Sequence, residues 1–475
     1  MILSIVLKEW KEFWRNRAMR LISLAYLAIY ALSVLSGAVE HRRYEASRVA
    51  AEKSVRESWL NQGDKNPHAA TYFGTVAFPK RSALSILEPG ALPYLGVAAY
   101  LRAGRRTEFV DLPARDESPL AGLANLTPAF CWQVIFPIVI VLLTYGALAR
   151  DRETGMERYL MAVGSNRATL VFGKTFGVGL VLLVISLVAF GLGGAIAALV
   201  GGFEREDTSA WLLLGLFYFL FSGTVFFLAL AISGLASTSQ KSLTGGLVIW
   251  LLLAVVLPRW VADNGRVLTA SPSAMEMNRI AESDLERGFE DRPPREARLE
   301  GTLNMLFREM KVGRREDLTV NLPGFYFISE AEVENASRGL RLGQARRTFV
   351  AQNATMEWGA AFSPATALQL LGSTLAGTSA SQRDSATDAA NLYAHRMRRI
   401  LNRELAAKGK EQGGAFLSGA KMWNQIDSFE ADLPQQFETA TGRTRSIVTL
   451  LIWFSLTLIL AATSGLVVPQ LGARA

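Results

Sequence analysis

The sequence predicts a mainly α-helical, polytopic membrane protein with six transmembrane helices, an N-terminal amphipathic helix and a mixed extracytoplasmic domain. Two observations support this fold class. Half of the 475 residues are hydrophobic and the mean hydropathy is +0.21, which is too apolar for an ordinary soluble protein of this size. Yet 19% of the residues are charged, so hydrophilic segments must accompany the apolar ones.

The membrane spans are placed by their length, because a hydrocarbon core of about 30 Å requires roughly 20 residues of helix. The fifth candidate is the shortest and ends near Pro258. Small residues such as Gly193, Gly194, Gly245 and Gly246 recur in these segments, which suits close helix packing in lipid. The six predicted spans are residues 19–39, 129–149, 175–201, 210–236, 243–259 and 446–468.

Residues 1–18 precede the first span and predict a separate amphipathic helix. Its apolar residues recur at i, i+3, i+4 and i+7, with the charged residues off that stripe. We expect an elbow helix in the cytoplasmic interface, with Trp10, Phe13 and Trp14 toward membrane lipids. A simple extension of the first span is the alternative. A cleaved secretory signal is not expected, since the cations follow the first apolar run instead of preceding it.

The distribution of cations predicts a bacterial inner-membrane protein with both termini in the cytoplasm. Five Lys or Arg residues lie between residues 8 and 20, at or just before the start of the first span, and five more lie in the loop 150–174, whereas the loop 202–209 is net acidic. Cations near residues 42 and 444 oppose this orientation, but they lie in or beside long loops, where the rule is weak. We therefore expect segments 40–128 and 260–445 to lie outside and to pack together as one domain.

The sequence predicts no catalytic site and no metal site. The single cysteine, Cys131, rules out a disulfide within one chain, and His41, His68 and His395 are far apart in sequence. Acidic residues in 274–335 alternate with arginines, as expected of a solvated, ion-paired helix. The net charge of +8 comes with no nucleic-acid recognition motif, so no nucleic-acid partner is expected.

The apolar cores of the six predicted spans contain no Asp, Glu, Lys, Arg or His. Carriers driven by protons or ions need ionisable groups at membrane depth. Energy for any transport must then come from outside the spans. Residues 168–175 approach a phosphate-binding loop, but Ala168 replaces the first glycine and the run leads into a membrane helix. We expect this chain to bind no cofactor and to hydrolyse no ATP.

The loop 150–174 is the densest charged cluster on the predicted cytoplasmic side. Its apolar residues have helical spacing and lie between Gly155 and Gly164. A short amphipathic helix at the membrane face suits docking into a groove on another protein. A solvated turn between two spans is the alternative.

This loop resembles the first cytoplasmic loop of ABC-2 type transporter permeases, through Glu153-x-Gly155, Leu160, Arg167 and Gly173-Lys174. The sequence departs from the family at Gly164-Ser165-Asn166, where a proline is frequent. The resemblance implies a coupling helix that engages a separate ATPase subunit, and an interfacial elbow at residues 1–18. The implied coupling residues are Glu153, Gly155, Met156, Glu157, Arg158, Tyr159, Leu160, Arg167 and Lys174.

The outer segments resemble the subfamily of these permeases that has a large periplasmic insert of unassigned function. The first interpretation of the shared motifs is that they supply turn and packing residues of a folded domain. The second interpretation is that they form a ligand site. The motifs are Tyr72-Phe73-Gly74, Leu87-Glu88-Pro89-Gly90, Pro93-Tyr94, Ser363-Pro364-Ala365, Leu368-Gln369, Leu375-Ala376-Gly377-Thr378 and Leu433-Pro434.

The resemblance implies the membrane subunit of an ATP-driven ABC exporter. A second permease subunit, identical or homologous, would complete the translocation path, and two ATPase subunits carrying ATP and magnesium would dock beneath. The alternative is a mechanotransmitter, in which ATP hydrolysis reshapes the outer domain and drives a periplasmic partner while nothing crosses the membrane. The sequence names neither the substrate nor such a partner.

Overall fold

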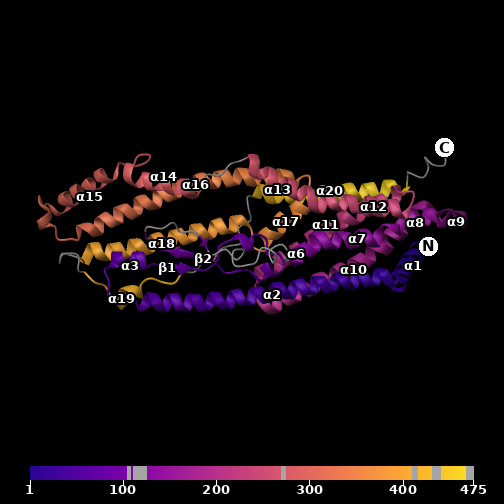
Figure 1. The fold of residues 1–475 in the computed structure, drawn as a ribbon, viewed down its shortest axis with the longest axis horizontal. Coiled ribbons are helices and arrows are strands. Elements are labelled where there is room, and N and C mark those ends of the chain that lie inside the picture. The colour runs from indigo at the N-terminus through magenta and orange to yellow at the C-terminus, as the bar shows by residue number, and fades with distance from the viewer. Residues whose placement is uncertain (104–108, 111–125, 269–273, 409–415, 430–439, 467–475) are drawn as a thin grey trace.

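The computed structural model describes residues 1–103, 109–110, 126–268, 274–408, 416–429 and 440–466, and these form an elongated molecule (Figure 1). One end is a bundle of apolar helices, which we call the membrane bundle. The other end, which we call the distal lobe, contains the second half of α2, α3, the sheet, α14–α16, α18 and α19. The N-terminal helix and the end of α20 both lie at the end of the molecule remote from the distal lobe (Figure 1).

Six helices are long and apolar enough to cross a membrane, which confirms the predicted helical fold with six spans. They are α2 (Arg17–Leu60), the run from α6 (Pro128–Phe130) through a π-helical turn (Cys131–Ile135), α7 (Phe136–Thr144) and α8 (Gly146–Glu153), then α10 (Arg167–Gly201), α11 (Arg205–Leu235), the run of α12 (Ser239–Leu251), a second π-helical turn (Leu252–Val256) and α13 (Leu257–Leu268), and α20 (Ala440–Leu466).

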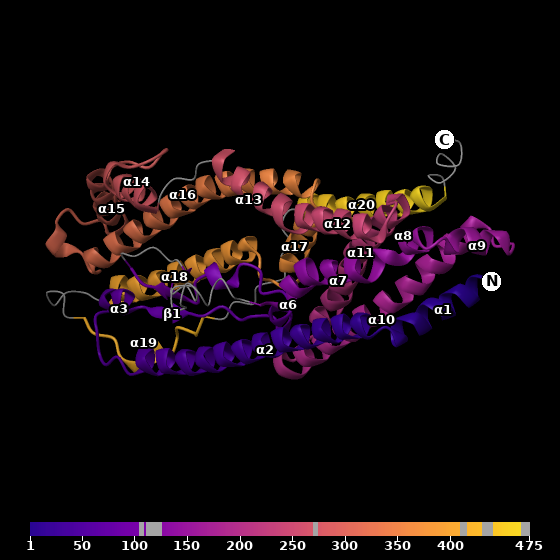
Figure 2. The ribbon, with the colours of Figure 1, turned by 45° about the vertical axis from the view of Figure 1, so that its right-hand side comes forward.

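The N-terminal helix α1 (Ile2–Arg15) is separated from α2 by Asn16, whose backbone is extended (φ −82°, ψ 109°). The Asn16 side chain accepts hydrogen bonds from the first amides of α2, so it acts as an N-cap that starts a new helix. Helix α1 packs along the first turns of α10 (Figure 2). The contact requires glycine, because a Cβ on Gly173 would lie 2.8 Å from Ile5 and one on Gly177 would lie 2.6 Å from Glu9.

The core of the membrane bundle is built around aromatic side chains. Tyr26 of α2 stacks on Phe136 of α7 with ring centroids 4.8 Å apart. Trp132 stacks on Tyr218 of α11, also at 4.8 Å. All four are nearly inaccessible to solvent, so the first, second and fourth spans meet in one buried contact.

The distal lobe is mixed, with one small sheet and several helices. Helices α14, α15 and α16 form one layer, and α18 and α3 lie beside it. The second half of α2 runs along the opposite side, with β1 and β2 between it and α18 (Figures 1 and 2). The sheet is antiparallel in the order β1-β2-β3, with Val76 opposite Tyr100 and Ala99 opposite Phe109. Besides the second half of α2, the helices and strands of the distal lobe are α3 (Pro67–Phe73), β1 (Thr75–Ala77), β2 (Ala98–Leu101), β3 (Phe109–Val110), α14 (Ala274–Arg287), α15 (Arg295–Met310), a 3₁₀ turn (Arg315–Asp317), α16 (Leu322–Ala360), α18 (Ala380–Lys408) and α19 (Ala420–Trp423).

The two long segments between the spans pack against each other in this lobe. Trp59 at the end of α2 and Trp423 of α19 have ring centroids 5.9 Å apart, and the Trp59 indole N–H donates to the Trp423 carbonyl. His68 of α3 stacks on Phe327 of α16 and hydrogen-bonds Asn402 of α18. The predicted association of segments 40–128 and 260–445 is therefore present, and the side of the membrane on which they lie stays a prediction.

Two pieces of these segments lie in the membrane bundle and not in the distal lobe. The first contains two 3₁₀ turns (Ala83–Ile86 and Leu92–Tyr94), and the second is α17 (Pro364–Leu375). Leu84, Ile86, Leu368 and Leu371 share one hydrophobic core with the spans. Helix α17 has 12 residues, too few to cross a bilayer, so a search for spans by length passes over it.

Candidate coupling site

The loop 150–174 folds as the short helix α9 (Met156–Ala162) between the ends of α8 and α10. The two flanking glycines have left-handed backbones, with φ +72° at Gly155 and +92° at Gly164, which other residues adopt only with strain. Asn166 then caps α10 by accepting from the Thr169 amide. The expected short helix between two glycines is therefore confirmed. Helix α9 lies at the end of the molecule opposite the distal lobe (Figure 1).

The outer surface of α9 is apolar and exposed. Tyr159 is 65% exposed, and Met156 and Arg158 are also exposed. The sequence argument included Val163 in the apolar stripe but did not select Met161, which adds to this surface. We call Met156, Tyr159, Met161 and Val163 the α9 surface. Leu160, predicted to fill a groove on the partner, is half-buried.

Two of the acidic residues predicted for docking are held within the chain. Glu157 pairs with Arg167 at 2.7 Å and with Arg152 at 3.4 Å, and it is mostly buried. Glu153 accepts hydrogen bonds from the backbone amide (3.0 Å) and hydroxyl (2.6 Å) of Ser239, at the start of α12. Both side chains therefore fix α9 and α8 to neighbouring helices, which the residue pattern alone did not reveal.

Arginines connect the same loop to the ends of two spans. The Arg152 guanidinium donates to the carbonyls of Gly234 and Ala236 at the end of α11, at 2.8 and 2.6 Å. The Arg167 guanidinium donates to the carbonyl of Gly465 in α20, at 2.6 Å. Cations suit these positions, because the last carbonyls of a helix lack intrahelical partners.

Lys174 forms a buried ionic cluster that the sequence argument identified only in part. Its ammonium lies 3.0 Å from a Glu9 carboxylate oxygen and 2.8 Å from an Asp151 oxygen, and only 5% of its side chain is exposed. These residues belong to α10, α1 and α8 respectively. The cluster therefore joins the N-terminal helix to the helix that leads into α9.

The three predicted elbow residues do not share one environment. Phe13 is buried in the membrane bundle, Trp10 is half-buried, and Trp14 is 52% exposed. The outward face of α1 also carries Leu3 and Leu7, which are exposed. Helix α1 thus has one face buried against the membrane bundle and one exposed face. Its position in the membrane–water interface stays a prediction.

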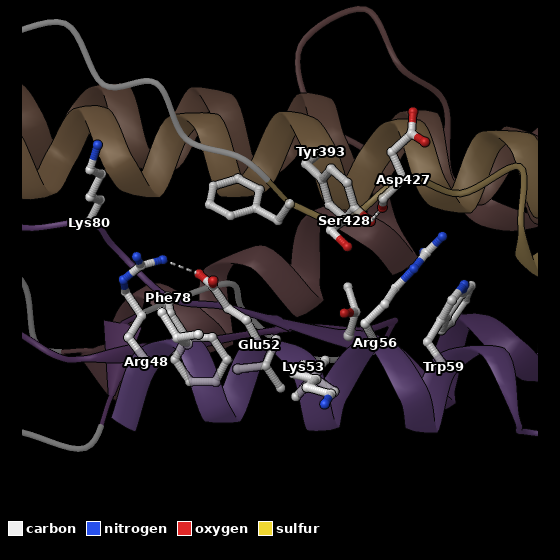
Figure 3. Close-up of a pocket in the computed structure, with 15 residues that line it drawn as sticks. Arg48, Glu52, Lys53, Arg56, Trp59, Phe78, Lys80, Tyr393, Asp427 and Ser428 are labelled. Carbon is white, nitrogen blue, oxygen red and sulfur yellow. Dashed lines mark hydrogen bonds and ion pairs between the residues drawn. The ribbon is translucent and has the colours of Figure 1, made fainter. Parts of the chain in front are cut away.

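The distal lobe contains a separate cavity of about 500 Å³ between α2, α18 and β1 (Figure 3). Basic and aromatic side chains line it, and several of its polar groups are paired within the chain. Arg48 binds Glu52 at 2.6 Å and also Glu45. The Arg56 guanidinium donates to a backbone carbonyl, and so does the Tyr393 hydroxyl. The cavity has a volume typical of ligand pockets, but its walls specify no ligand.

The described part of the chain holds no group of three or more His, Cys, Asp or Glu residues arranged to bind a metal ion. The single cysteine, Cys131, is buried beside Ser33 in the membrane bundle.

Comparison with known proteins gives the family. A family model described as ABC-2 family transporter protein matches residues 3–464. The chain is similar to the probable ABC transporter permease protein NosY of Stutzerimonas stutzeri, with 30% identity over 176 residues, 35% of this chain and 56% of that protein. The similarity to the same-named protein of Pseudomonas aeruginosa is 32% over 181 residues, 37% of this chain and 59% of that protein.

The chain thus spans less than two thirds of the length of either relative, whereas the family model extends over nearly all of the chain. The protein belongs to the ABC-2 family of transporter proteins.

Proposed function

We propose that this protein is a permease subunit that couples ATP hydrolysis in a separate ATPase subunit to the export of a substrate, and that α9 is the docking element. The observation that carries the proposal is the α9 surface, which exposes four apolar side chains on one short helix between charged loop ends. A small exposed apolar patch with a polar rim is typical of a protein interface. Glu153 and Glu157 then hold α9 in place, while Arg158 is exposed for charge contact with the partner.

A force on α9 would reach several spans through the contacts of its loop. The pair of Glu157 and Arg167 connects α9 to the start of α10, and Arg152 connects the end of α8 to α11. Glu153 connects the same end to α12, and Lys174 connects α10 to α1. ATP-driven closure of the motor subunits would therefore tilt these helices together.

The assembly that we propose contains two permease subunits, identical or homologous, and two ATPase subunits that bind ATP and magnesium. Docking of a cytoplasmic ATPase on α9 places both termini in the cytoplasm and the distal lobe outside a bacterial inner membrane. The outward faces of α12 and α20 carry exposed side chains such as Leu251, Val255, Ile452 and Ile459, which suit contact with lipid or with the second permease.

The test is co-purification with the cognate ATPase. Tyr159→Ala removes the largest exposed aromatic side chain of the α9 surface, and truncation of such an interface residue commonly weakens binding by about 2 kcal/mol, roughly thirtyfold. The matched control is Tyr94→Ala, because Tyr94 is 70% exposed but lies outside the coupling loop. Retention of wild-type ATPase binding by Tyr159→Ala combined with Arg158→Glu would contradict the docking proposal.

A second candidate function, mechanotransmission, is favoured by the length of α2. Its 44 residues extend about 66 Å as one continuous helix, of which a bilayer core takes up about 30 Å. The remainder leads into the distal lobe, so the helix can carry movement there directly. Ala50→Pro would kink this exposed stretch. Retained export with this variant favours transport, whereas loss of a partner's activity with intact ATPase coupling favours mechanotransmission.

A further inference from the structure

Two motifs that lie far apart in the sequence meet inside the membrane bundle. The segment 82–95 contains Leu87-Glu88-Pro89-Gly90, and α17 with its following turn contains Leu375-Ala376-Gly377-Thr378. The Thr378 hydroxyl donates to the Glu88 carbonyl at 2.9 Å, and the Ala91 amide donates to the Thr378 carbonyl at 3.0 Å. The two motifs are therefore joined by hydrogen bonds.

The segment 82–95 runs along α11 in space and enters the membrane bundle. Ser82 donates to Asp207 at the start of α11 at 2.7 Å, and Glu88 reaches Tyr218 further along the same helix. These two positions on α11 are about 16 Å apart along the helix axis. Leu87 packs against Gly193 of α10 on the way. An acidic side chain thus lies among the spans, although the spans themselves carry none in their apolar cores.

Glu88 is 1% exposed and is held by neutral donors. One carboxyl oxygen accepts from the Tyr218 hydroxyl at 2.5 Å and from the Gln133 side-chain amide at 3.3 Å. Gly372 of α17 is pressed against the same oxygen, since a Cβ there would lie 2.7 Å from it. The carboxyl group therefore contacts α11, the start of the second span and α17 at once.

Two titratable side chains act on Glu88, and both are tyrosines, which ordinarily carry no charge near pH 7. They are Tyr30 from α2 and Tyr218 from α11. Helix α17 has no ionisable residue. No Lys, Arg or His of the described chain is among the groups that shift the pKa of Glu88. Burial raises this pKa to about 8, and the hydrogen bonds from Tyr218 and Gln133 lower it by less than burial raises it.

We propose that Glu88 is a proton-binding site whose protonated carboxyl latches the segment 82–95 and α17 onto α11 within the membrane bundle. While the proton is bound, one oxygen of the neutral acid still accepts from Tyr218 and Gln133, and α17 packs closely against it. When the proton leaves to water, a buried carboxylate without a cation remains, which is costly. The segment 82–95 and α17 then separate from α11 so that water can reach the charge. The proposal concerns this junction alone and does not depend on the direction of transport.

The sign of the pH dependence follows from proton linkage. The latched state binds the proton more tightly than the open state, so raising the pH favours opening between the ordinary pKa of a glutamate and the raised pKa of about 8. Over that range the opening equilibrium rises by up to tenfold per pH unit. Between pH 6 and pH 8 the expected increase is about fiftyfold.

Hydrogen exchange with mass spectrometry on the full chain in lipid nanodiscs measures this opening. Rates at pH 6, 7 and 8 are corrected for the intrinsic pH dependence of amide exchange. We expect peptides covering 82–95 and 364–378 to lose about fiftyfold of their protection between pH 6 and pH 8. Glu88→Gln, which is neutral at every pH, should abolish this change. The control Glu300→Gln alters an exposed acid of the distal lobe and should behave as wild type.

Tyr218→Phe keeps the test decisive if Glu88→Gln fails to fold. It removes one donor to Glu88 but leaves the carboxyl in place, so protection should fall at every pH while its decline with pH persists. Equal protection at pH 6 and pH 8 in the wild-type protein would overturn the proposal. An unchanged pH dependence in folded Glu88→Gln would overturn it as well.

Discussion

Lys174→Met is expected to destabilise the membrane bundle strongly. The substitution keeps an unbranched side chain that is one atom shorter and removes the cation that lies 3.0 Å from Glu9 and 2.8 Å from Asp151. Each of those carboxylates is only 11% exposed, so both would remain buried without a partner. Removal of one member of a buried ion pair costs about 3–5 kcal/mol. For a cooperative unit of about 200 residues, this lowers the Tm by roughly 10 °C.

Thermal melts in detergent, followed by tryptophan fluorescence, measure the loss. The matched control is Lys408→Met, because Lys408 pairs with Glu404 but is 65% exposed, and such surface pairs contribute about 0–1 kcal/mol. Combining Lys174→Met with Glu9→Gln and Asp151→Asn should recover most of the stability, since no uncompensated charge is left. A melting temperature of Lys174→Met equal to that of wild type would refute the reasoning, and so would a triple variant no more stable than the single one.

Three further outcomes follow from the structure. Arg167→Met breaks the 2.7 Å pair with Glu157, so we expect the loop 150–174 to become cleavable by protease at α9 while the spans stay intact; unchanged cleavage would count against the pair as an anchor. Trp423→Ala removes a fully buried side chain of the distal lobe and should cost about 3–5 kcal/mol, seen as earlier melting and faster proteolysis of that lobe. Gly173→Leu would clash with Ile5 and displace α1, which hydrogen exchange of residues 2–15 would reveal as lost protection.

The sequence was sufficient to predict the six spans, because continuous apolar length is the property that lipid selects. It did not indicate how far the first helix extends. Hydropathy falls after residue 39, yet α2 continues to Leu60 through residues whose charges pair along the helix, such as Arg48 with Glu52. Hydropathy therefore locates the membrane and leaves the end of the helix undetermined.

The coupling loop was predicted in outline, and the roles of its charges were not. Two glycines bracket α9 as expected, because left-handed backbone positions require them. In the sequence, Glu153, Glu157 and Arg158 are all charged residues of one short loop. In the structure, Glu153 binds Ser239 and Glu157 binds Arg152 and Arg167, whereas Arg158 stays exposed. A local pattern does not show which of these charges pair, and Ser239, the partner of Glu153, lies 86 residues away.

Glu88 shows more clearly that a sequence pattern does not reveal contacts between distant parts of the chain. A single acid between leucine and proline in a segment assigned to the outside is expected to be solvated. The structure buries it against Tyr218 and Gly372, which belong to two other parts of the chain. Hydropathy shows ionisable residues at membrane depth only where they belong to a span, and Glu88 belongs to a loop that enters between the spans.

Site-specific photo-crosslinking at Tyr159 tests the central claim, that α9 receives the ATPase subunit, most directly. A photoreactive amino acid replaces Tyr159, or Tyr94 as an equally exposed position outside the coupling loop, in the full chain within its native membrane. We predict a crosslink to the ABC ATPase from position 159 and none from position 94. A complex that hydrolyses ATP but gives no crosslink from position 159 would contradict the claim.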